Sequence, residues 1–378
     1  MIISKVHIIG TAGLKDIFIE SDLIKKVDAH KDGLPSSIQM PNGSFAFPGL
    51  INSHDHLDFN LFPQLGNRIY KNYKEWGDDI NKNNISAINA VLLIPQALRT
   101  QWGIYKNLLN GVTTVINHGN HLTVDNALIT VFQDCYALHS TAYEKNWKWK
   151  LNDPFKINKP FVIHTGEGTD EAAGHEIDEL IKANRFKKKM IAVHGVAMKP
   201  HQAKAFEALV WCPASNYFLL NATTGIGKLK TNTAILFGTD STLSAGWNIW
   251  EHIRMAKKTT CLTDTELIDT LTFVAAGIWN LNTGAITENK NADIVIAKNK
   301  QGMTEINNFF ALDPEDILLV ISNGHIRLFD ECLLSQMTVA GFNSITINGS
   351  VKYIEGDLPA LSKKIKQYYP DAVFPFSK

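Results

Sequence analysis

The stretch from Phe47 to Asp58, FPGLINSHDHLD, decides how this chain folds. Its apolar part, PGLIN, is typical of a buried strand, and His54 and His56 come at the end of that strand. Residues two apart on an extended strand point to the same side, so both imidazoles can reach one metal ion. Neutral imidazole is the commonest nitrogen ligand of zinc-type metals. A histidine pair also arises by chance, and the metal-site hypothesis therefore depends on whether later strands carry further ligands.

The composition of the 378-residue chain predicts a soluble globular protein with one large domain and an appendage. Hydrophobic residues make up 45% and charged residues 20%, which is ordinary for this class. Lys and Arg number 37, and so do Asp and Glu, so no net field attracts nucleic acid or an anionic membrane. The first ten residues lack a signal-peptide pattern, and no apolar stretch is long enough to cross a bilayer. We therefore expect neither a nucleic-acid nor a membrane partner.

The cysteines indicate a reducing compartment. They are scattered along the chain and form no short CxxC pair: Cys135, Cys212, Cys261 and Cys332. This spacing argues against both a disulfide framework and a cysteine metal site. We expect a cytoplasmic protein.

Residues 48–281 alternate apolar strands with helical segments. Besides PGLINS, strands are predicted within 111–119, 129–140, 160–167, 190–196, 208–216 and 234–241. Repeated β-α units imply parallel strands with right-handed crossovers, and continuous apolar runs suit strands that are covered on both faces. The sequence therefore predicts an α/β fold with a (β/α)8 TIM-like barrel, and a doubly wound open sheet is the alternative.

The two ends of the chain are predicted to form an accessory β domain. Residues 1–47 and 282–349 consist of short β-rich segments broken by Gly, Asp and Pro. Neither piece can bury much core by itself, so we expect them to join in one small sheet or sandwich, with the barrel of residues 48–281 inserted between them. Residues 350–378 predict a helical tail.

Further acid and imidazole side chains come after other predicted strands. His164 ends FVIH, with Glu167 three residues later, His194 ends IAVH, and Asp240 ends ILFGTD. In a β/α barrel the carboxyl ends of all strands face one mouth, where active sites lie. A catalytic zinc-type site needs about three protein ligands and an open position for water. The alternative for these residues is a set of hydrogen-bonded core groups, and for Glu167 a helix cap.

Six segments of the chain, taken in order, resemble the amidohydrolase superfamily: PGLINSHDHLD, GVTTVINHG, IHTGEGTDEAA, AVHG, CPASN and FGTDS. They are most similar to the branch with guanine and cytosine deaminases, triazine hydrolases and imidazolonepropionases, and the resemblance covers residues 1 to about 350. It implies metal ligation by four residues: His54, His56, His164 and Asp240. It also implies a catalytic role for Asp240, a proton shuttle at Glu167, and a residue at His194 that polarises the substrate or hydrogen-bonds the hydroxide.

The resemblance implies a metal-dependent hydrolase of non-peptide C–N bonds that acts on a small molecule. Deamination of a small cyclic nitrogen compound is favoured over opening of a ring amide, as in imidazolonepropionases. One divalent metal ion is expected, with zinc favoured over iron or manganese, and a homodimer is compatible with this class. The alternative from another class is a non-catalytic scaffold that only binds a ligand.

Two departures from the family pattern concern the substrate pocket and the metal count. The segment between His118 and Phe161 is short for two β-α units, so we expect one barrel strand or helix to be degenerate. No lysine ends a strand in a position for carbamylation, which favours a single metal. His118 and His121 either face the mouth or are ordinary loop histidines, and Trp247 either stacks on a substrate or packs in the core or a lid.

Overall fold

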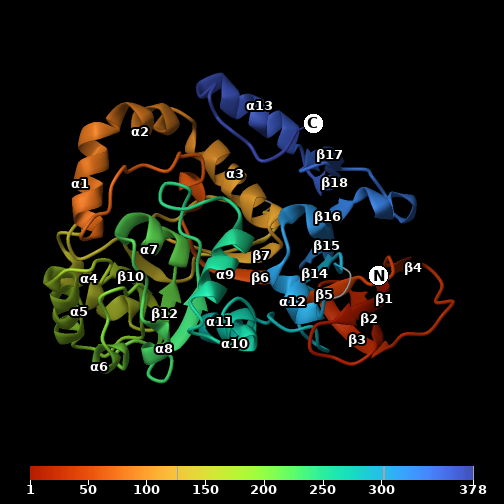
Figure 1. Cartoon of the computed structure of the whole chain (residues 1–378), viewed down its shortest axis with the longest axis horizontal. Coiled ribbons are helices and arrows are strands. Elements are labelled where there is room, and N and C mark those ends of the chain that lie inside the picture. Colours follow the sequence, from red (N-terminus) through yellow and green to blue (C-terminus); the bar gives the residue numbers. More distant parts are fainter. Residues whose placement is uncertain (126, 301–302, 378) are drawn as a thin grey trace.

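Two groups of strands organise the chain in the computed structural model, which describes residues 1–125, 127–300 and 303–377 (Figure 1). The strands of the middle region are β6 (Leu50–Asp55), β7 (Val112–Asn117), β8 (Thr130–Phe132), β9 (Tyr136–Leu138), β10 (Phe161–Thr165), β11 (Met190–His194), β12 (Ala208–Trp211) and β13 (Ala234–Phe237). All neighbours among them pair in parallel, in the orders β6-β7-β8 and β13-β12-β11-β10-β9. The predicted α/β class with parallel strands is confirmed.

The two parallel sheets meet at β6 and β13 beside the strand ends. The backbone N–H groups of Thr239 and Asp240, just after β13, donate to the carbonyl oxygen of His54 at 3.1 and 3.0 Å. Among the described residues, no strand ladder joins β8 to β9. The strands therefore form two sheets and not one continuous eight-stranded ring, and a closed barrel stays a prediction.

The segment 129–140, predicted as one strand, differs from that expectation. It contains the three-residue strands β8 and β9, separated by a bend at Cys135. The first pairs with β7 and the second with β10, so this one segment links the two sheets. No described helix lies between β7 and β8 or between β8 and β9, which agrees with the expectation that this region is shortened.

Helices accompany the other parallel strands. They are α1 (Tyr73–Asn83), α2 (Ile85–Leu92), α3 (Gln96–Leu109), α4 (Trp147–Leu151), α5 (Glu171–Ala183), α6 (Pro200–Ala203), α7 (Pro213–Leu220), α8 (Ile226–Leu229), α9 (Ile249–Lys258), α10 (Asp264–Asp269) and α11 (Phe273–Trp279). Helix α5 shows why such segments form: Asp170 accepts the Ala173 N–H as an N-cap, and Ile177 and Leu180 lie on one buried face. Among the described residues, no helix combines the length and apolar character needed to cross a lipid bilayer.

Strands from both ends of the chain share one ten-stranded sheet, ordered β17-β18-β16-β15-β14-β5-β1-β2-β3 with β4 beside β1. Its strands are β1 (Ile2–Ile8), β2 (Leu14–Glu20), β3 (Leu23–Ala29), β4 (Ser37–Gln39), β5 (Phe45–Pro48), β14 (Ile294–Ala297), β15 (Ile317–Ser322), β16 (His325–Asp330), β17 (Phe342–Ile347) and β18 (Ser350–Glu355). The two ends meet where β5 pairs antiparallel with β14. Helix α12 (Glu305–Phe310) precedes β15, and α13 (Leu358–Tyr368) comes after β18.

The predicted helical tail of residues 350–378 begins with a strand. β18 pairs with both β16 and β17, and the helix starts only at Leu358. The alternation in SVKYIE explains this difference, because Lys352 and Ile354 are buried while their neighbours are partly exposed.

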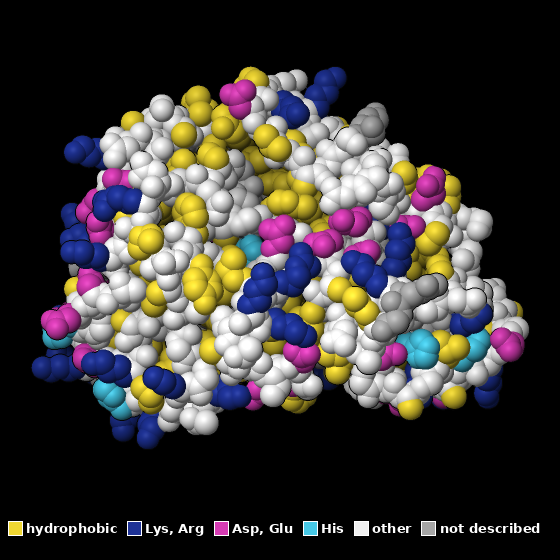
Figure 2. Space-filling view, viewed as in Figure 1, with side chains coloured by type: hydrophobic (Ala, Val, Ile, Leu, Met, Phe, Trp, Pro, Cys, Tyr) yellow, Lys and Arg dark blue, Asp and Glu magenta, His cyan; other side chains and the backbone are white. Residues whose placement is uncertain are grey.

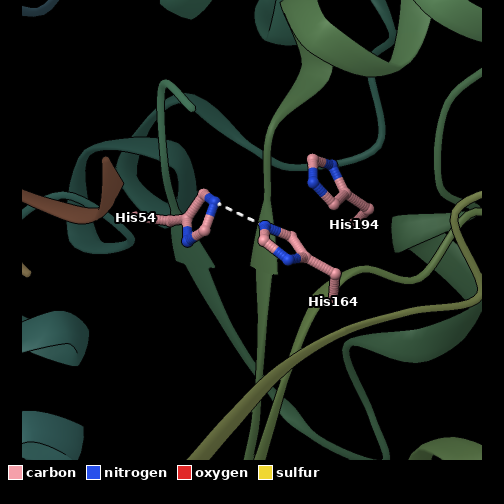
Figure 3. Close-up of side chains that lie close together, drawn as sticks. All are labelled: His54, His164 and His194. Atoms are coloured by element: carbon pink, nitrogen blue, oxygen red, sulfur yellow. Dashed lines mark hydrogen bonds between the residues drawn. The ribbon is translucent and has the colours of Figure 1, made fainter. Parts of the chain in front are cut away.

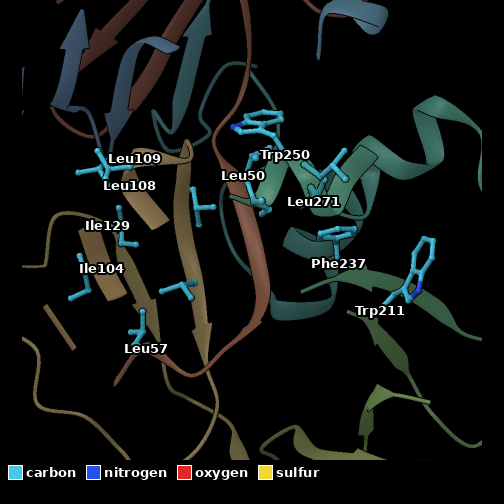
Figure 4. Close-up of a cluster of buried hydrophobic side chains, with 14 of the residues drawn as sticks. Leu50, Leu57, Ile104, Leu108, Leu109, Ile129, Trp211, Phe237, Trp250 and Leu271 are labelled. Atoms are coloured by element: carbon cyan, nitrogen blue, oxygen red, sulfur yellow. The ribbon is translucent and has the colours of Figure 1, made fainter. Parts of the chain in front are cut away.

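The largest apolar core connects the parallel strands to their helices (Figure 4). Leu50 of β6, Phe237 of β13 and Trp250 of α9 are fully buried in it. Burying a large apolar side chain contributes about 1.5–3 kcal/mol before entropy is counted. This core therefore fixes the strand ends that carry the polar side chains.

Candidate active site

Imidazole and carboxylate side chains gather at the carboxyl ends of the parallel strands. His54 lies in β6, His164 in β10 and His194 at the end of β11, and the three rings face a common space (Figure 3). His56 comes after β6 and Asp240 after β13. The structure thus brings together residues that are up to 186 positions apart in the sequence. They meet at the strand ends, where active sites of β/α folds lie.

The distances within the cluster are those of groups that share a ligand. The Nε2 atoms of His54 and His164 are 3.1 Å apart. Oδ1 of Asp240 lies 3.7 Å from Nε2 of His54 and 3.6 Å from Nε2 of His56. Two groups of three residues could hold a metal ion, and His54 belongs to both: His54, His164 and His194, and His54, His56 and Asp240.

In two of these histidines, hydrogen bonds determine which ring nitrogen carries no proton. Nδ1 of His164 lies 2.7 Å from the carbonyl oxygen of His139, which can only accept, so Nδ1 carries the proton and Nε2 is free. Nδ1 of His194 likewise donates to Oδ1 of Asn216 at 2.9 Å. A metal-binding histidine almost always donates its other ring N–H in this way. Both rings are therefore oriented as ligands or acceptors toward the cluster.

Burial keeps the imidazoles neutral, as metal binding requires. Desolvation, with some repulsion from His54, lowers the pKa of His56 to about 3. The pKa of His164 lies well below its usual value, first because of burial and then because of neighbouring histidines. The pKa of His194 falls to about 4, again chiefly through burial.

The spacing of the nitrogens fits a metal ion. Two ligands at about 2.0–2.1 Å from a tetrahedral zinc-type ion lie roughly 3.3 Å apart. The 3.1 Å between the Nε2 atoms of His54 and His164 is close to that separation. Because Nε2 of His164 has no proton of its own, a cation between the two rings would satisfy both lone pairs. The donor set of imidazoles and one carboxylate suits a divalent metal.

Asp240 is held as a carboxylate beside the imidazoles. Burial alone would raise its pKa, but contact with His54 and the nearby His56 and His194 outweighs that effect and holds the pKa well below its usual range. Oδ2 accepts hydrogen bonds from Ser215 at 2.8 Å and from Ser244 at 2.7 Å. The other oxygen, Oδ1, is directed at the histidines.

Backbone conformation at the strand ends is restricted by close packing. Both His194 and Asp240 have positive φ angles, 69° and 58°, which non-glycine residues rarely adopt. Such conformations are found chiefly where the surrounding structure over-determines them, often at functional sites. Gly238 allows the close approach of β13 to β6, because a Cβ there would lie 2.8 Å from the Cβ of His54.

Glu167 is a buried acid at the edge of the cluster, and its pKa is raised. Burial first, then the negative charges of Asp240 and Glu176, raise its pKa well above the usual value. Its Oε2 lies 3.6 Å from Nε2 of His194. Its backbone carbonyl accepts the N–H of Tyr73 at the start of α1, so the loop that carries this acid is tied to that helix.

A second buried carboxylate, Glu176 of α5, connects the loops around the site. Oε1 accepts hydrogen bonds from Thr141 at 2.6 Å and from the hydroxyl of Tyr73 at 3.1 Å. Oε2 accepts the backbone N–H of Gly166, next to Glu167, at 3.2 Å. One side chain thus joins the loop after β9, the loop after β10 and helix α1.

An ion pair lies next to His54 and His56. Asp55 and Lys106 are almost completely buried, and Nζ of Lys106 lies 3.1 Å from Oδ2 of Asp55. Asn107 and Asn60 donate to the two carboxylate oxygens at 2.7 and 2.8 Å, and Oδ1 of Asn60 accepts from the lysine at 2.8 Å. This network fixes the backbone between His54 and His56.

A cavity of about 220 Å³ opens onto the cluster. Helix α1 forms one wall with Tyr73, Trp76 and Ile80, and Phe59 and Tyr143 add further aromatic surface. The imidazole and carboxyl side chains that reach the cavity are His56, His139, His164, Glu167, His194 and Asp240, and Asn81, Ser241 and Ser244 add neutral polar groups. Aromatic walls with a few convergent polar groups are typical of sites for small, partly apolar molecules.

A sequence model of the amidohydrolase family matches residues 139–327, which is half of the chain. The chain belongs to the amidohydrolase family. This confirms the predicted class, a metal-dependent hydrolase acting on carbon–nitrogen bonds. None of the curated proteins matches this amidohydrolase in sequence.

Solved structures share the fold of this amidohydrolase over most of its length. An adenosine deaminase from Xanthomonas campestris with bound zinc has a TM-score of 0.73 at 15% identity, covering 98% of this chain and 97% of the other. An atrazine chlorohydrolase from Arthrobacter aurescens, complexed with zinc, has a TM-score of 0.67 at 14% identity, covering 86% of this chain and 94% of the other. A guanine deaminase from C. acetobutylicum with bound guanine has a TM-score of 0.66 at 15% identity, covering 86% of this chain and 99% of the other. At these identities the likeness concerns the fold.

The residues whose roles the sequence left open lie in three different places in the structure. His118 is buried in the cluster, with its ring 4.4 Å from that of His164, and donates from Nε2 to the Leu138 carbonyl, which leaves a buried, unpartnered Nδ1. His121 lines a second cavity. Trp247 lines a different cavity, beside Trp102, and not the one at the cluster.

His139 was not among the site residues predicted from the sequence, yet it lines the cavity with its ring 5.1 Å from that of His164. It comes directly after β9, as the other histidines come at the ends of their strands. The same strand-end rule would have found it if the segment 129–140 had been divided into two strands.

Proposed function

We propose that this amidohydrolase deaminates a small cyclic nitrogen compound, with one divalent metal ion, zinc in first place, held by His54, His56, His164 and Asp240. The observation that supports this most directly is the 3.1 Å distance between the Nε2 atoms of His54 and His164, next to the Asp240 carboxylate, whose pKa lies well below its usual range. A metal ion bound there would supply an activated water at neutral pH. The same observation argues against a purely structural role for these side chains.

The chain's own residues would move the protons. Asp240, as a carboxylate with Oδ1 toward the histidines, would accept the proton of the attacking water. Glu167, whose pKa is raised by burial, would donate its proton to a ring nitrogen of the substrate, take up the proton that Asp240 accepted, and donate that proton to the leaving amine. The hydroxyl proton of the adduct would return to Glu167 as the carbonyl forms. His194 would accept a hydrogen bond from the attacking water through its bare Nε2. The net reaction adds water, breaks the C–N bond and releases ammonia and a carbonyl product.

The fold comparisons are compatible with deamination. Of the three solved structures described above, two are deaminases, one of adenosine and one of guanine, and two contain zinc. We also propose a division of the chain into an accessory domain of residues 1–47 and 282–349 and a catalytic barrel of residues 48–281. The ten-stranded sheet that joins both ends supports this division.

Metal analysis together with an ammonia-release screen tests the proposal. The protein, purified without added metal or chelator, should contain about one metal ion per chain and release ammonia from an aminated purine, pyrimidine or triazine. His56→Ala should lose most of the metal, whereas His175→Ala, on the exposed face of α5, should keep it. Bound metal with hydrolysis of ring amides and no ammonia would replace deamination by ring opening. Failure to bind zinc, iron or manganese would overturn the proposal.

A further inference from the structure

A second cavity, of about 520 Å³, adjoins the one at the histidine cluster. Three side chains line both cavities: His56, Phe59 and His139. His139 is exposed although it lies beside the buried His164, so its ring is accessible from the cavity space. The two cavities therefore meet at these three side chains.

We infer that the substrate has two parts, an aminated ring in the first cavity and a polar arm with an acidic group in the second. This inference rests on the proposed function, because it assigns the ring to the deaminating site. The second cavity then determines which derivatives of a given ring are accepted.

The sizes of the cavities support a two-part ligand. Pockets for small ligands usually have volumes of roughly 300–1,000 Å³. The first cavity alone, at about 220 Å³, is smaller than that range and has room for little beyond a ring system. The two cavities together fall within the range.

The walls of the two cavities differ in chemistry. The first is largely aromatic and aliphatic away from the cluster. The second is lined by amides, imidazoles and charged groups, among them Gln96, Asn117, His121 and Gln133. Some of these groups already have partners: Gln96 donates to Asp58, and Gln133 exchanges two hydrogen bonds with the backbone of Leu122. An apolar arm would shield such polar walls from water without offering hydrogen bonds, which costs free energy, whereas a polar arm can bond to their remaining donors and acceptors.

The charges in the second cavity favour an acidic group. Glu144 is paired with Lys150 at 2.6 Å, and Asp58 lies 3.6 Å from Arg99. Among the described residues, no carboxylate lies within 4 Å of the ammonium group of Lys156, which sits 3.9 Å from the ring centroid of Tyr136. Lys156 is therefore the cation in this cavity that remains available to an anionic ligand.

The shortened part of the barrel creates this space. The lining runs from the end of β7 through β9 to Lys156, which is the stretch without full β-α units. No described helix lies between β7 and β9, and the second cavity lies on that side of the cluster.

Kinetics with matched substrates test the inference. Adenine, cytosine and guanine are each offered to the zinc-loaded protein as the base, the nucleoside and the nucleoside 5′-monophosphate, and ammonia release is measured. For at least one ring, we expect kcat/KM of the monophosphate to exceed that of the base at least tenfold, mainly through KM. Lys156→Gln should narrow this ratio by about tenfold, the effect of one charge-assisted hydrogen bond.

Lys145→Gln is the matched control, because Lys145 is exposed and lines neither cavity. It should keep the wild-type ratio. If bases are deaminated as fast as their nucleosides and monophosphates, the two-part substrate is wrong while the proposed function stands. An unchanged ratio in Lys156→Gln would also overturn the inference. If no ring releases ammonia in any form, the proposed function fails and this inference fails with it.

Discussion

At the scale of single residues, Glu167 offers the sharpest test, because its protonation and its position can be separated. Replacing it with glutamine keeps the shape of the side chain but removes the transferable proton. We expect Glu167→Gln to bind metal as the wild type does and to lose turnover by about 100- to 10,000-fold, the usual contribution of a general acid or base. Metal stoichiometry and initial rates, measured on one preparation, check this. Full activity in the variant would remove the proton-shuttle assignment.

The raised pKa of Glu167 also predicts a direction for pH dependence. The acid is protonated below its raised pKa, so activity that needs its proton declines as pH rises through that value. In the folded, metal-free protein the carboxyl binds its proton more tightly than in the unfolded chain, so ionising it lowers stability as pH rises above its usual pKa. Glu167→Gln should therefore unfold at the same or a higher denaturant concentration at pH 7. A marked loss of stability would show that the carboxylate has a structural role.

The ion pair of Asp55 and Lys106 predicts how firmly His54 and His56 are held. Lys106→Met would leave a buried carboxylate without its cation, which typically costs about 3–5 kcal/mol. We expect a lower free energy of unfolding and weaker metal retention, since Asp55 lies between His54 and His56. Adding Asp55→Asn should recover much of the stability, because the unpaired charge is then removed. Urea unfolding of both variants measures this, and additive losses in the double variant would contradict it.

At the scale of elements, helix α5 and helix α1 are coupled through one side chain. Glu176 accepts hydrogen bonds from Gly166, Thr141 and Tyr73. Glu176→Ala would leave these donors without their partner, at a cost of about 1–3 kcal/mol for each that stays buried. Because Gly166 precedes Glu167, we expect kcat to fall more than tenfold with little change in metal content.

Glu179→Gln on the exposed face of α5 is the control for this prediction, and it should leave kcat and KM unchanged. Glu176→Gln keeps an acceptor oxygen and should recover part of the lost kcat. If Glu176→Ala lowers only stability and leaves kcat intact, the network supports the fold but does not position the catalytic loop.

The elements also show why some of this site could be predicted and some could not. His54, His164 and His194 come at the ends of apolar runs, so the strand-end rule found them from the sequence alone. The strands β8 and β9 have three residues each, too few to show a periodicity, and the bend between them hid His139. The roles of these histidines as ligands and catalysts are still predictions.

At the scale of the molecule, the ten-stranded sheet is joined directly to the strand that carries the candidate ligands. Only Gly49 separates β5 of that sheet from β6, and its N–H donates to the carbonyl oxygen of Asp293. A Cβ at Gly49 would clash with the side chain of Thr113. The sequence indicated a sheet from both ends, but the pairing of β5 with β14 needs contacts between residues about 250 positions apart, which no local pattern reveals.

A buried ion pair in this sheet predicts how the whole molecule responds to acid. Nζ of Lys352 lies 2.6 Å from Oδ2 of Asp330 and also donates to the carbonyl oxygens of Glu315 and Ile317, so it joins β15, β16 and β18. Burial alone would raise the pKa of Asp330, but Lys352 outweighs it and lowers the pKa to about 2. A depressed carboxyl pKa gives stability that is present above the unfolded value, near 4, and is lost as pH falls to about 2.

We therefore expect Asp330→Asn to lower the free energy of unfolding by about 3 kcal/mol at pH 6, since one partner of a buried pair is removed. As pH falls from about 4 to about 2, the difference in the free energy of unfolding between wild type and variant should decrease by about 2 kcal/mol, because the wild type loses the stabilisation from its charged carboxylate there. Urea unfolding across that range measures the gap. Asp28→Asn, which removes an exposed pair with Lys26 in the same sheet, should leave the free energy of unfolding nearly unchanged. A gap that stays constant from pH 6 to pH 2 would show that the Asp330 carboxylate contributes nothing through its charge.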